Sequence, residues 1–200
     1  MKEAITLPRR FALLLAMILM AAAGFAQVPT AGNVFLGYTL NHADVGWGTT
    51  GNLSGWELSA EGKVAPFVGI VGDLGATYGS TPIPTADLFG GTGNTSTQTR
   101  VVTFMVGPRA SFSVGKFRPF AQVLVGGAHL HQVVQYKNDY SYGQSDWTDA
   151  FGGGVDYQIR SRIAVRVQGD DLQTRFHNDY PMHPGRKDNA RISAGIVLKF

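Results

Sequence analysis

The chain has 200 residues, which suits one domain, with 16% charged residues, 26 glycines, 12 phenylalanines and no cysteine. The charged fraction is well below the roughly 25% of an average soluble domain, and the lack of cysteine excludes disulfides, thiolate catalysis and cysteine metal sites. The formal net charge is only +3, so the composition does not indicate a nucleic-acid-binding protein.

The N-terminal segment has the layout of an export signal. Basic residues precede an apolar run over residues 11–23, and small residues follow as far as Ala26. This order is typical of a secretory signal peptide, and the run is too short for a comfortable transmembrane helix. We predict a signal peptide over residues 1–26, cleaved between Ala26 and Gln27, and a single domain over residues 27–200. A retained anchor helix is the less favoured alternative.

After Thr30, apolar and polar residues alternate, and no segment carries the 3.6-residue period of a helix. The strands predicted from this alternation cover residues 33–41, 53–64, 67–78, 100–114, 119–136, 147–159, 162–176 and 189–200. Long and short connections alternate, and the long ones, residues 42–52, 79–99, 137–146 and 177–188, are predicted to be loops. This pattern indicates an antiparallel up-and-down barrel with all its long loops at one end.

Each predicted strand has one bulky apolar face and one face of small and charged residues. A soluble lipocalin-like barrel also alternates, but it turns its apolar face inward and its charges to water. An eight-stranded barrel has room inside only for side chains, so small residues with compensating charges suit its interior. We therefore predict an all-β, eight-stranded antiparallel up-and-down transmembrane β-barrel with its bulky face toward lipid. The residues predicted to form aromatic girdles are Tyr38, Trp56, Tyr78, Tyr157 and Phe200.

Two local features of the strands need separate predictions. In the fifth predicted strand, over residues 119–136, the alternation shows less clearly than in the others which residues face inward. We place Gln122 inside the barrel. In the fourth strand Pro108 has no backbone N–H for the ladder, which predicts a β-bulge at or beside this residue.

Charges on the inward face are costly unless they are paired. We predict an interior network of ion pairs and hydrogen bonds made by Glu57, Asp73, Arg109, Asp156, Arg166, Asp170 and Arg191. The simpler role for such a network is to fill and stiffen the barrel, and a gated ion path is the alternative.

The terminal strand ends on Phe200, with Leu198 and Ile196 on the same face. Together with the Gly-Gly-Gly-Val-Asp-Tyr run at 152–157, it resembles the small OmpA-like or OmpX-like outer-membrane β-barrel family over residues 33–200. The resemblance implies a monomer in the bacterial outer membrane, surrounded by its lipid. It also implies that Phe200, Leu198 and Ile196 form the signal read by the barrel-assembly machinery, with periplasmic chaperones as further partners.

Histidines are the only candidates for chemistry. His129 and His131 share a face of the fifth strand, and His177 and His183 flank Asp179 in the last loop. By spacing, neither pair has beside it the serine and the acid that such catalysis needs together, and two histidines alone do not make a metal site. We therefore predict no catalytic residue, metal or cofactor.

The expected function follows from the long polar loops, which suit extracellular contacts on a rigid scaffold. We expect a structural or surface-interaction role, covering envelope integrity or adhesion-type loop contacts, with an extracellular ligand as a further partner. A small gated pore and a lipid-modifying enzyme are the alternatives. The loop predicted over residues 79–99 has few large apolar residues, with Leu88 and Phe89 as its candidate anchors, and so few anchors argue against a strong protein interface.

Overall fold

The computed structural model describes residues 31–44, 50–84, 94–135, 140–174 and 187–200. The predicted signal peptide lies outside these residues, as do Leu88, Phe89, His177, Asp179 and His183. No helix within the described ranges is long and apolar enough to cross a membrane.

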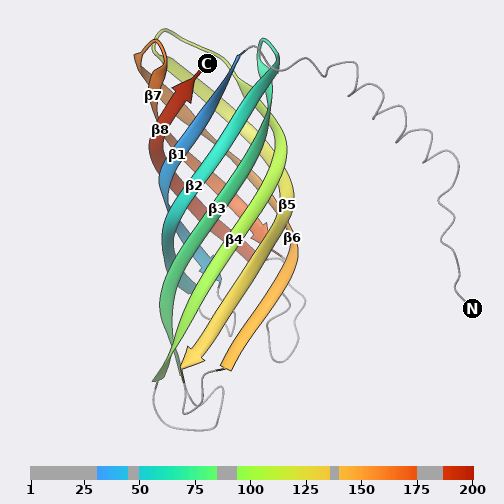
Figure 1. The fold of residues 1–200 in the computed structure, drawn as a ribbon, viewed down its shortest axis with the longest axis vertical. Helices are drawn as coiled ribbons and strands as arrows, with labels where there is room; N and C mark the ends of the chain where they lie inside the picture. Colours follow the sequence, from blue (N-terminus) through green and yellow to red (C-terminus); the bar gives the residue numbers. More distant parts are fainter. Residues whose placement is uncertain (1–30, 45–49, 85–93, 136–139, 175–186) are drawn as a thin grey trace, which may run out of the picture. The chain divides into compact units, whose positions relative to one another are not determined.

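Eight strands make one closed, antiparallel barrel, shown in Figure 1. In chain order they are β1 (Gly32–Asp44), β2 (Thr50–Ala65), β3 (Val68–Pro84), β4 (Asn94–Ser111), β5 (Phe117–Gln135), β6 (Tyr140–Arg160), β7 (Ile163–Thr174) and β8 (Lys187–Lys199). Each strand pairs with its neighbours in the chain, and β8 closes the barrel on β1 from Lys199↔Asn33 to Ala190↔His42. The predicted fold class is confirmed.

Several strands are longer than the sequence predicts. β3 continues to Pro84 and pairs there with Asn94 at the start of β4, so residues 79–84 and 94–99 are strand where a loop was predicted. β6 likewise begins at Tyr140, inside another predicted loop. The alternation of apolar and polar residues ends where the apolar outer surface of the barrel ends. Polar residues with high β-propensity, such as Thr and Tyr, continue the strand pairing beyond that point, so the alternation does not reveal these strand ends.

Short extensions occur in β1, β2 and β8, but most of the extra length lies on one side of the barrel. β2 pairs with β3 only as far as Tyr78, and β7 pairs with β6 only from Thr148. Beyond those points four strands continue together, as Figure 1 shows for β4, β5 and β6. We call this part the outer extension; it comprises residues 79–84, 94–99, 132–135 and 140–147.

The two faces of the wall are the reverse of those of a soluble barrel. Outward-facing Leu36, Phe104 and Ile196 are 59%, 64% and 55% exposed, whereas Glu57 and Arg166 are fully buried inside. Apolar side chains outside and paired charges inside are what a lipid-embedded barrel requires. The lipocalin-like alternative is therefore wrong.

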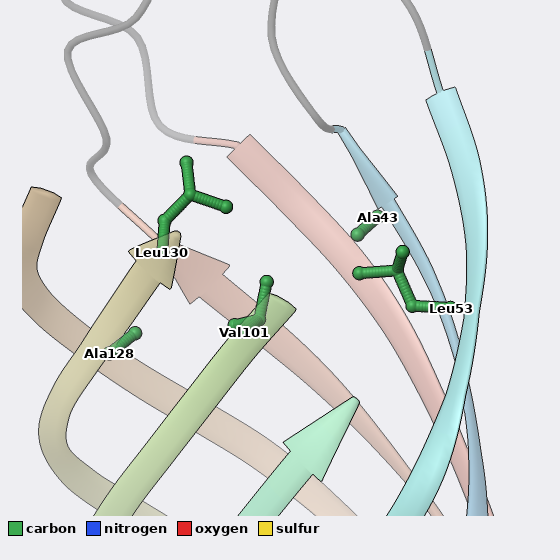
Figure 2. Packing of buried hydrophobic residues seen from close by; sticks show 5 residues of the cluster. All are labelled: Ala43, Leu53, Val101, Ala128 and Leu130. Carbon is green, nitrogen blue, oxygen red and sulfur yellow. The ribbon is translucent and has the colours of Figure 1, made fainter. Parts of the chain in front are cut away.

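The interior also holds large apolar side chains, which the expectation of small and charged residues did not include. Phe35, Leu53, Met105 and Leu124 are all fully buried. Three apolar clusters lie inside the barrel: Ala43, Leu53, Val101, Ala128 and Leu130; Val71, Met105, Leu124, Ala150 and Leu172; and Phe35, Ala164 and Val197. The first of these, shown in Figure 2, lies where β1, β2 and β5 approach their long connections. We call it the apolar plug.

The bulge predicted at Pro108 is absent. Pro108 pairs with Ile70 of β3, and the β4–β5 register is the same on either side of it, at Val106↔Val125 and Arg109↔Gln122. Gly107 lets β5 come close, because a Cβ there would lie 2.0 Å from the carbonyl oxygen of Val123. The register instead shifts between Lys63 and Ala65 and between Gln158 and Arg160, beside short turns. Gln122 lies inside the barrel, as predicted.

Candidate functional site

The middle of the barrel interior is organised around Arg191 of β8. Its Nη2 lies 2.8 Å from Oδ2 of Asp170, which the β7–β8 register places directly opposite. Its Nη1 reaches 3.0 Å across the lumen to Oδ1 of Asp73 on β3, and its Nε lies 3.7 Å from Glu57 of β2. One guanidinium thus joins three strand-borne carboxylates, all of them buried.

Neutral side chains extend this middle network. Gln168 donates to Oε1 of Glu57 at 2.6 Å and to Oδ2 of Asp170 at 3.2 Å. Ser193 donates to the second oxygen of Glu57, and Gln122 donates to Oδ1 of Asp170 at 2.7 Å. Buried carboxylates with these partners are far less costly than isolated ones.

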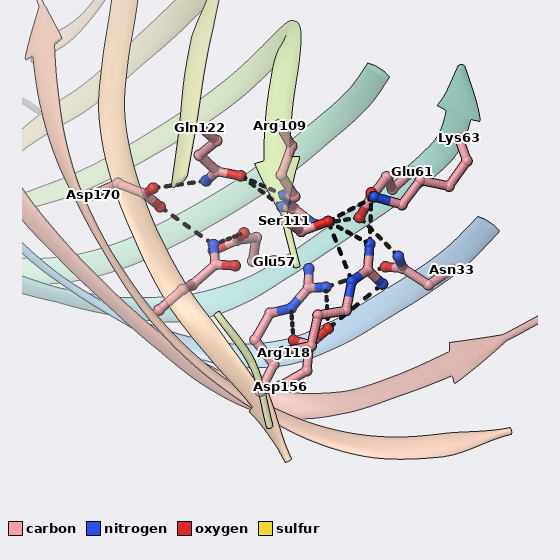
Figure 3. A network of polar contacts seen from close by, with 12 residues as sticks. Asn33, Glu57, Glu61, Lys63, Arg109, Ser111, Arg118, Gln122, Asp156 and Asp170 are labelled. Atoms are coloured by element: carbon pink, nitrogen blue, oxygen red, sulfur yellow. Dashed lines mark hydrogen bonds and ion pairs between the residues drawn. The ribbon is translucent and has the colours of Figure 1, made fainter. Parts of the chain in front are cut away.

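A second network lies nearer the short turns, around Glu61 of β2 (Figure 3). Its carboxylate lies 2.8 Å from Arg118, 3.1 Å from Lys63 and 3.3 Å from Arg109, and it also accepts from the Asn33 amide at 2.8 Å. Three cations from three different strands therefore share a single buried carboxylate.

Arg166 and Asp156 form the tightest ion pair in this second network. They face each other across β6 and β7, and Nε and Nη2 of Arg166 donate to the two oxygens of Asp156 at 2.6 and 3.1 Å. The Arg166 guanidinium also lies 5.0 Å from the ring centre of Phe35 and 4.7 Å from that of Phe120. These cation–π contacts partly replace the hydration that the guanidinium loses when it is buried.

The seven residues predicted for the interior network all lie inside the barrel, but their pairing differs in one respect. Arg109 pairs with Glu61 and with Oε1 of Gln122 at 2.6 Å, not with any of the four predicted carboxylates. Gln122 also donates to Asp170, so it links the two networks. Glu61, Lys63 and Arg118 were not among the seven predicted residues. Glu61 and Lys63 continue the inward alternation of Glu57 and could have been found from it, whereas Arg118 precedes the predicted start of its strand.

The histidines of β5 lie on the outward wall. His129 faces Ser145 of β6 in the register, and its Nδ1 lies 2.8 Å from the Ser145 hydroxyl oxygen. Spacing along the chain places no serine beside these histidines, but strand pairing does, because Ser145 is 16 residues from His129 in the sequence and lies opposite it on the next strand. Within the described ranges, no group of three or more His, Asp or Glu side chains could hold a metal ion.

The outward wall carries a band of apolar residues with aromatic residues at its limits. At the short-turn end, Phe67, Phe112, Phe117 and Phe200 are all more than half exposed. At the other end of the band, Tyr38 and Trp147 are more than half exposed, and Tyr78 lies beside Arg100, the first charged outward residue of β4. Aromatic residues at both limits of an apolar band are typical of barrels that cross a membrane.

No protein-family model matches this chain, and no curated protein matches it either. Several solved structures do match this chain. Ail of Yersinia pestis, solved in complex with the heparin analogue sucrose octasulfate, is 13% identical, with a TM-score of 0.59 over 85% of this chain and 98% of that one. Neisserial surface protein A is 12% identical, with a TM-score of 0.60 over 85% and 99%. A major outer-membrane protein of Thermus thermophilus is 12% identical, with a TM-score of 0.54 over 86% and 100%. The shared feature is the fold, that of small outer-membrane β-barrels.

Proposed function

We propose that this outer-membrane β-barrel is sealed along its axis and acts as a structural scaffold that presents a surface for extracellular contacts. The observation that carries the proposal is the filling of the lumen by two polar networks and the apolar plug. A pore of useful width needs an interior free of such side chains.

The contacts that seal the barrel join opposite walls. Arg191 connects β8 to β3, and Arg118 connects β5 to β2. Nearer the long connections, Leu53, Val101 and Leu130 of the apolar plug turn toward one another inside the barrel (Figure 2). An ion would have to break buried ion pairs and then cross an apolar constriction, and such constrictions block hydrated ions by dewetting.

We expect no single-channel current from the purified, refolded protein in planar lipid bilayers. The measurement is a current trace at stepped voltages, with protein-free detergent as the negative control and a porin in the same bilayer as the positive control. Discrete, reproducible opening steps that scale with protein concentration would contradict the sealed barrel and favour the gated pore.

The outer extension is the surface we propose for contacts. Within the described part of the chain, β3 has no paired strand beyond Tyr78 on its β2 side, and β6 has none before Thr148 on its β7 side. Free strand edges accept a further strand through backbone hydrogen bonds. Ail was solved with a bound heparin analogue, so ligand binding is compatible with this fold.

A lipid-modifying enzyme has weaker support. The His129–Ser145 contact supplies a base beside a hydroxyl, but catalysis by such a pair also needs a third group to orient the histidine and donors for the developing oxyanion. Among the described residues, no carboxylate hydrogen bond or ion pair to His129 accompanies the contact. We therefore propose a non-catalytic barrel.

We also propose that Phe200 acts in assembly. Its ring is 66% exposed, whereas its backbone exchanges two hydrogen bonds with Gly32. Replacing Phe200 with Ala keeps those backbone bonds and removes only the exposed ring.

For Phe200→Ala we expect the yield in the outer membrane to fall severalfold, while the urea midpoint of protein refolded in detergent changes little. The comparison uses membrane fractionation and unfolding of the same variant, with Phe112→Ala as the control for an exposed girdle ring. Equal membrane yields for wild type and Phe200→Ala would refute the role.

A further inference from the structure

The short-turn end of the barrel carries more positive than negative side chains. The inward-facing cations there are Lys63, Arg109, Arg118, Arg166 and Lys199, and the carboxylates that pair with them are Glu61 and Asp156. The other three fully buried carboxylates of the described residues, Glu57, Asp73 and Asp170, pair with Arg191 in the middle of the barrel. The surplus is three positive charges, and an α-carboxylate on Phe200 would reduce it to two. Partly buried cations without compensation are costly.

A hollow of about 450 Å³ opens among these cations. Lys63, Arg118 and Lys199 line it on its charged side, together with Asn33 and Ser111. Phe67, Phe112 and Phe200 line it as well, and their rings are exposed at the girdle. The hollow therefore has a cationic side and an aromatic side, and the aromatic side is continuous with the lipid-facing wall.

Two of the cations converge on a neutral oxygen. The hydroxyl oxygen of Ser111 accepts from Nζ of Lys63 at 2.6 Å and from Nη2 of Arg118 at 2.9 Å. Lys199 donates to Gln158 at 3.4 Å, which is a long hydrogen bond for a charged donor. An ammonium has three donors and a guanidinium five, so donors remain for a further oxygen-rich anion beside Ser111.

We propose that this hollow at the short-turn end is a binding site for a phosphate group. Lys63, Arg118 and Lys199 supply charge-assisted hydrogen bonds to its oxygens, and the group offsets the surplus of positive charge. Two sources have this chemistry: the headgroup of an anionic phospholipid in the adjacent leaflet, and free inorganic phosphate. The site does not depend on whether the lumen is sealed.

The test measures binding to the full barrel refolded in detergent micelles. Dihexanoylphosphatidylglycerol, the zwitterionic dihexanoylphosphatidylcholine and inorganic phosphate are titrated separately by calorimetry, and the thermal unfolding midpoint is followed for each. We expect saturable binding of the anionic lipid that weakens with added salt, and none of the zwitterionic lipid. Lys63→Gln and Lys199→Gln should each weaken binding about tenfold, the usual cost of one charge-assisted hydrogen bond. Arg100→Gln, at the opposite end of β4, is the matched control and should bind as the wild type does.

The outcomes separate the two sources. Binding of the anionic lipid without binding of inorganic phosphate assigns the site to a lipid headgroup, and comparable binding of inorganic phosphate assigns it to the free ion. Lys199→Gln removes only one long hydrogen bond, so it remains informative if Lys63→Gln fails to refold. No saturable binding of either probe, or equal binding by wild type and Lys199→Gln, would overturn the proposal.

Discussion

Replacing Arg191 with Met should lower the free energy of unfolding by about 3–5 kcal/mol, the usual cost of removing one partner from a buried ion pair. The substitution leaves Asp73, Asp170 and Glu57 buried without their shared cation. Met has a similar length and adds no polar group. The measurement is urea unfolding of the refolded protein in lipid vesicles, followed by tryptophan fluorescence and by the gel shift between boiled and unboiled samples.

The matched control for this variant is Arg100→Met. Arg100 faces outward and lies 5.5 Å from the ring centre of Tyr78, so its loss should cost at most about 1 kcal/mol. Adding Asp73→Asn and Asp170→Asn to Arg191→Met should recover part of the lost stability, because the uncompensated charges are then removed. If Arg191→Met unfolds at the same urea concentration as the wild type, the network does not stabilise the barrel.

Replacing Gly195 with Val should prevent clean closure of the barrel and cost about 3 kcal/mol, at the upper end for an overpacked site. Gly195 faces Gly37 across the β1–β8 seam. A Cβ at Gly195 would lie 2.2 Å from the carbonyl oxygen of Leu36 and 2.3 Å from Cα of Gly37. These are backbone atoms, so the strands themselves must separate to make room.

Gly72→Val is the control for this second variant, because a Cβ at Gly72 meets nothing within 4 Å. The measurement is the fraction of refolded protein that migrates as a compact band without boiling, at equal protein and detergent concentrations. Gly195→Val should lose most of that band and Gly72→Val should keep it. Equal fractions for the two variants would show that the seam tolerates a wider strand spacing than the structure has.

The amino-acid sequence alone determined which residues face lipid and which face inward. Side chains in a strand alternate strictly, so Phe104 and Arg109 could be assigned to opposite faces without any knowledge of partners. The number of strands followed from the same alternation and from the turn residues between its runs. The ends of β3 and β6 could not be predicted this way, because polar strands beyond the apolar band carry no inward–outward contrast.

Only the tertiary structure decided which inward residues meet. Arg191 and Asp73 are 118 positions apart, and they touch because the barrel is narrow enough for β8 to reach β3 across the lumen. The same closure gathers Lys63, Arg109 and Arg118 onto Glu61 and leaves a surplus of positive charge at the short-turn end. Alternation specifies a direction for each side chain, whereas a contact also requires register, tilt and distance across the barrel. Those quantities exist only once all eight strands have closed.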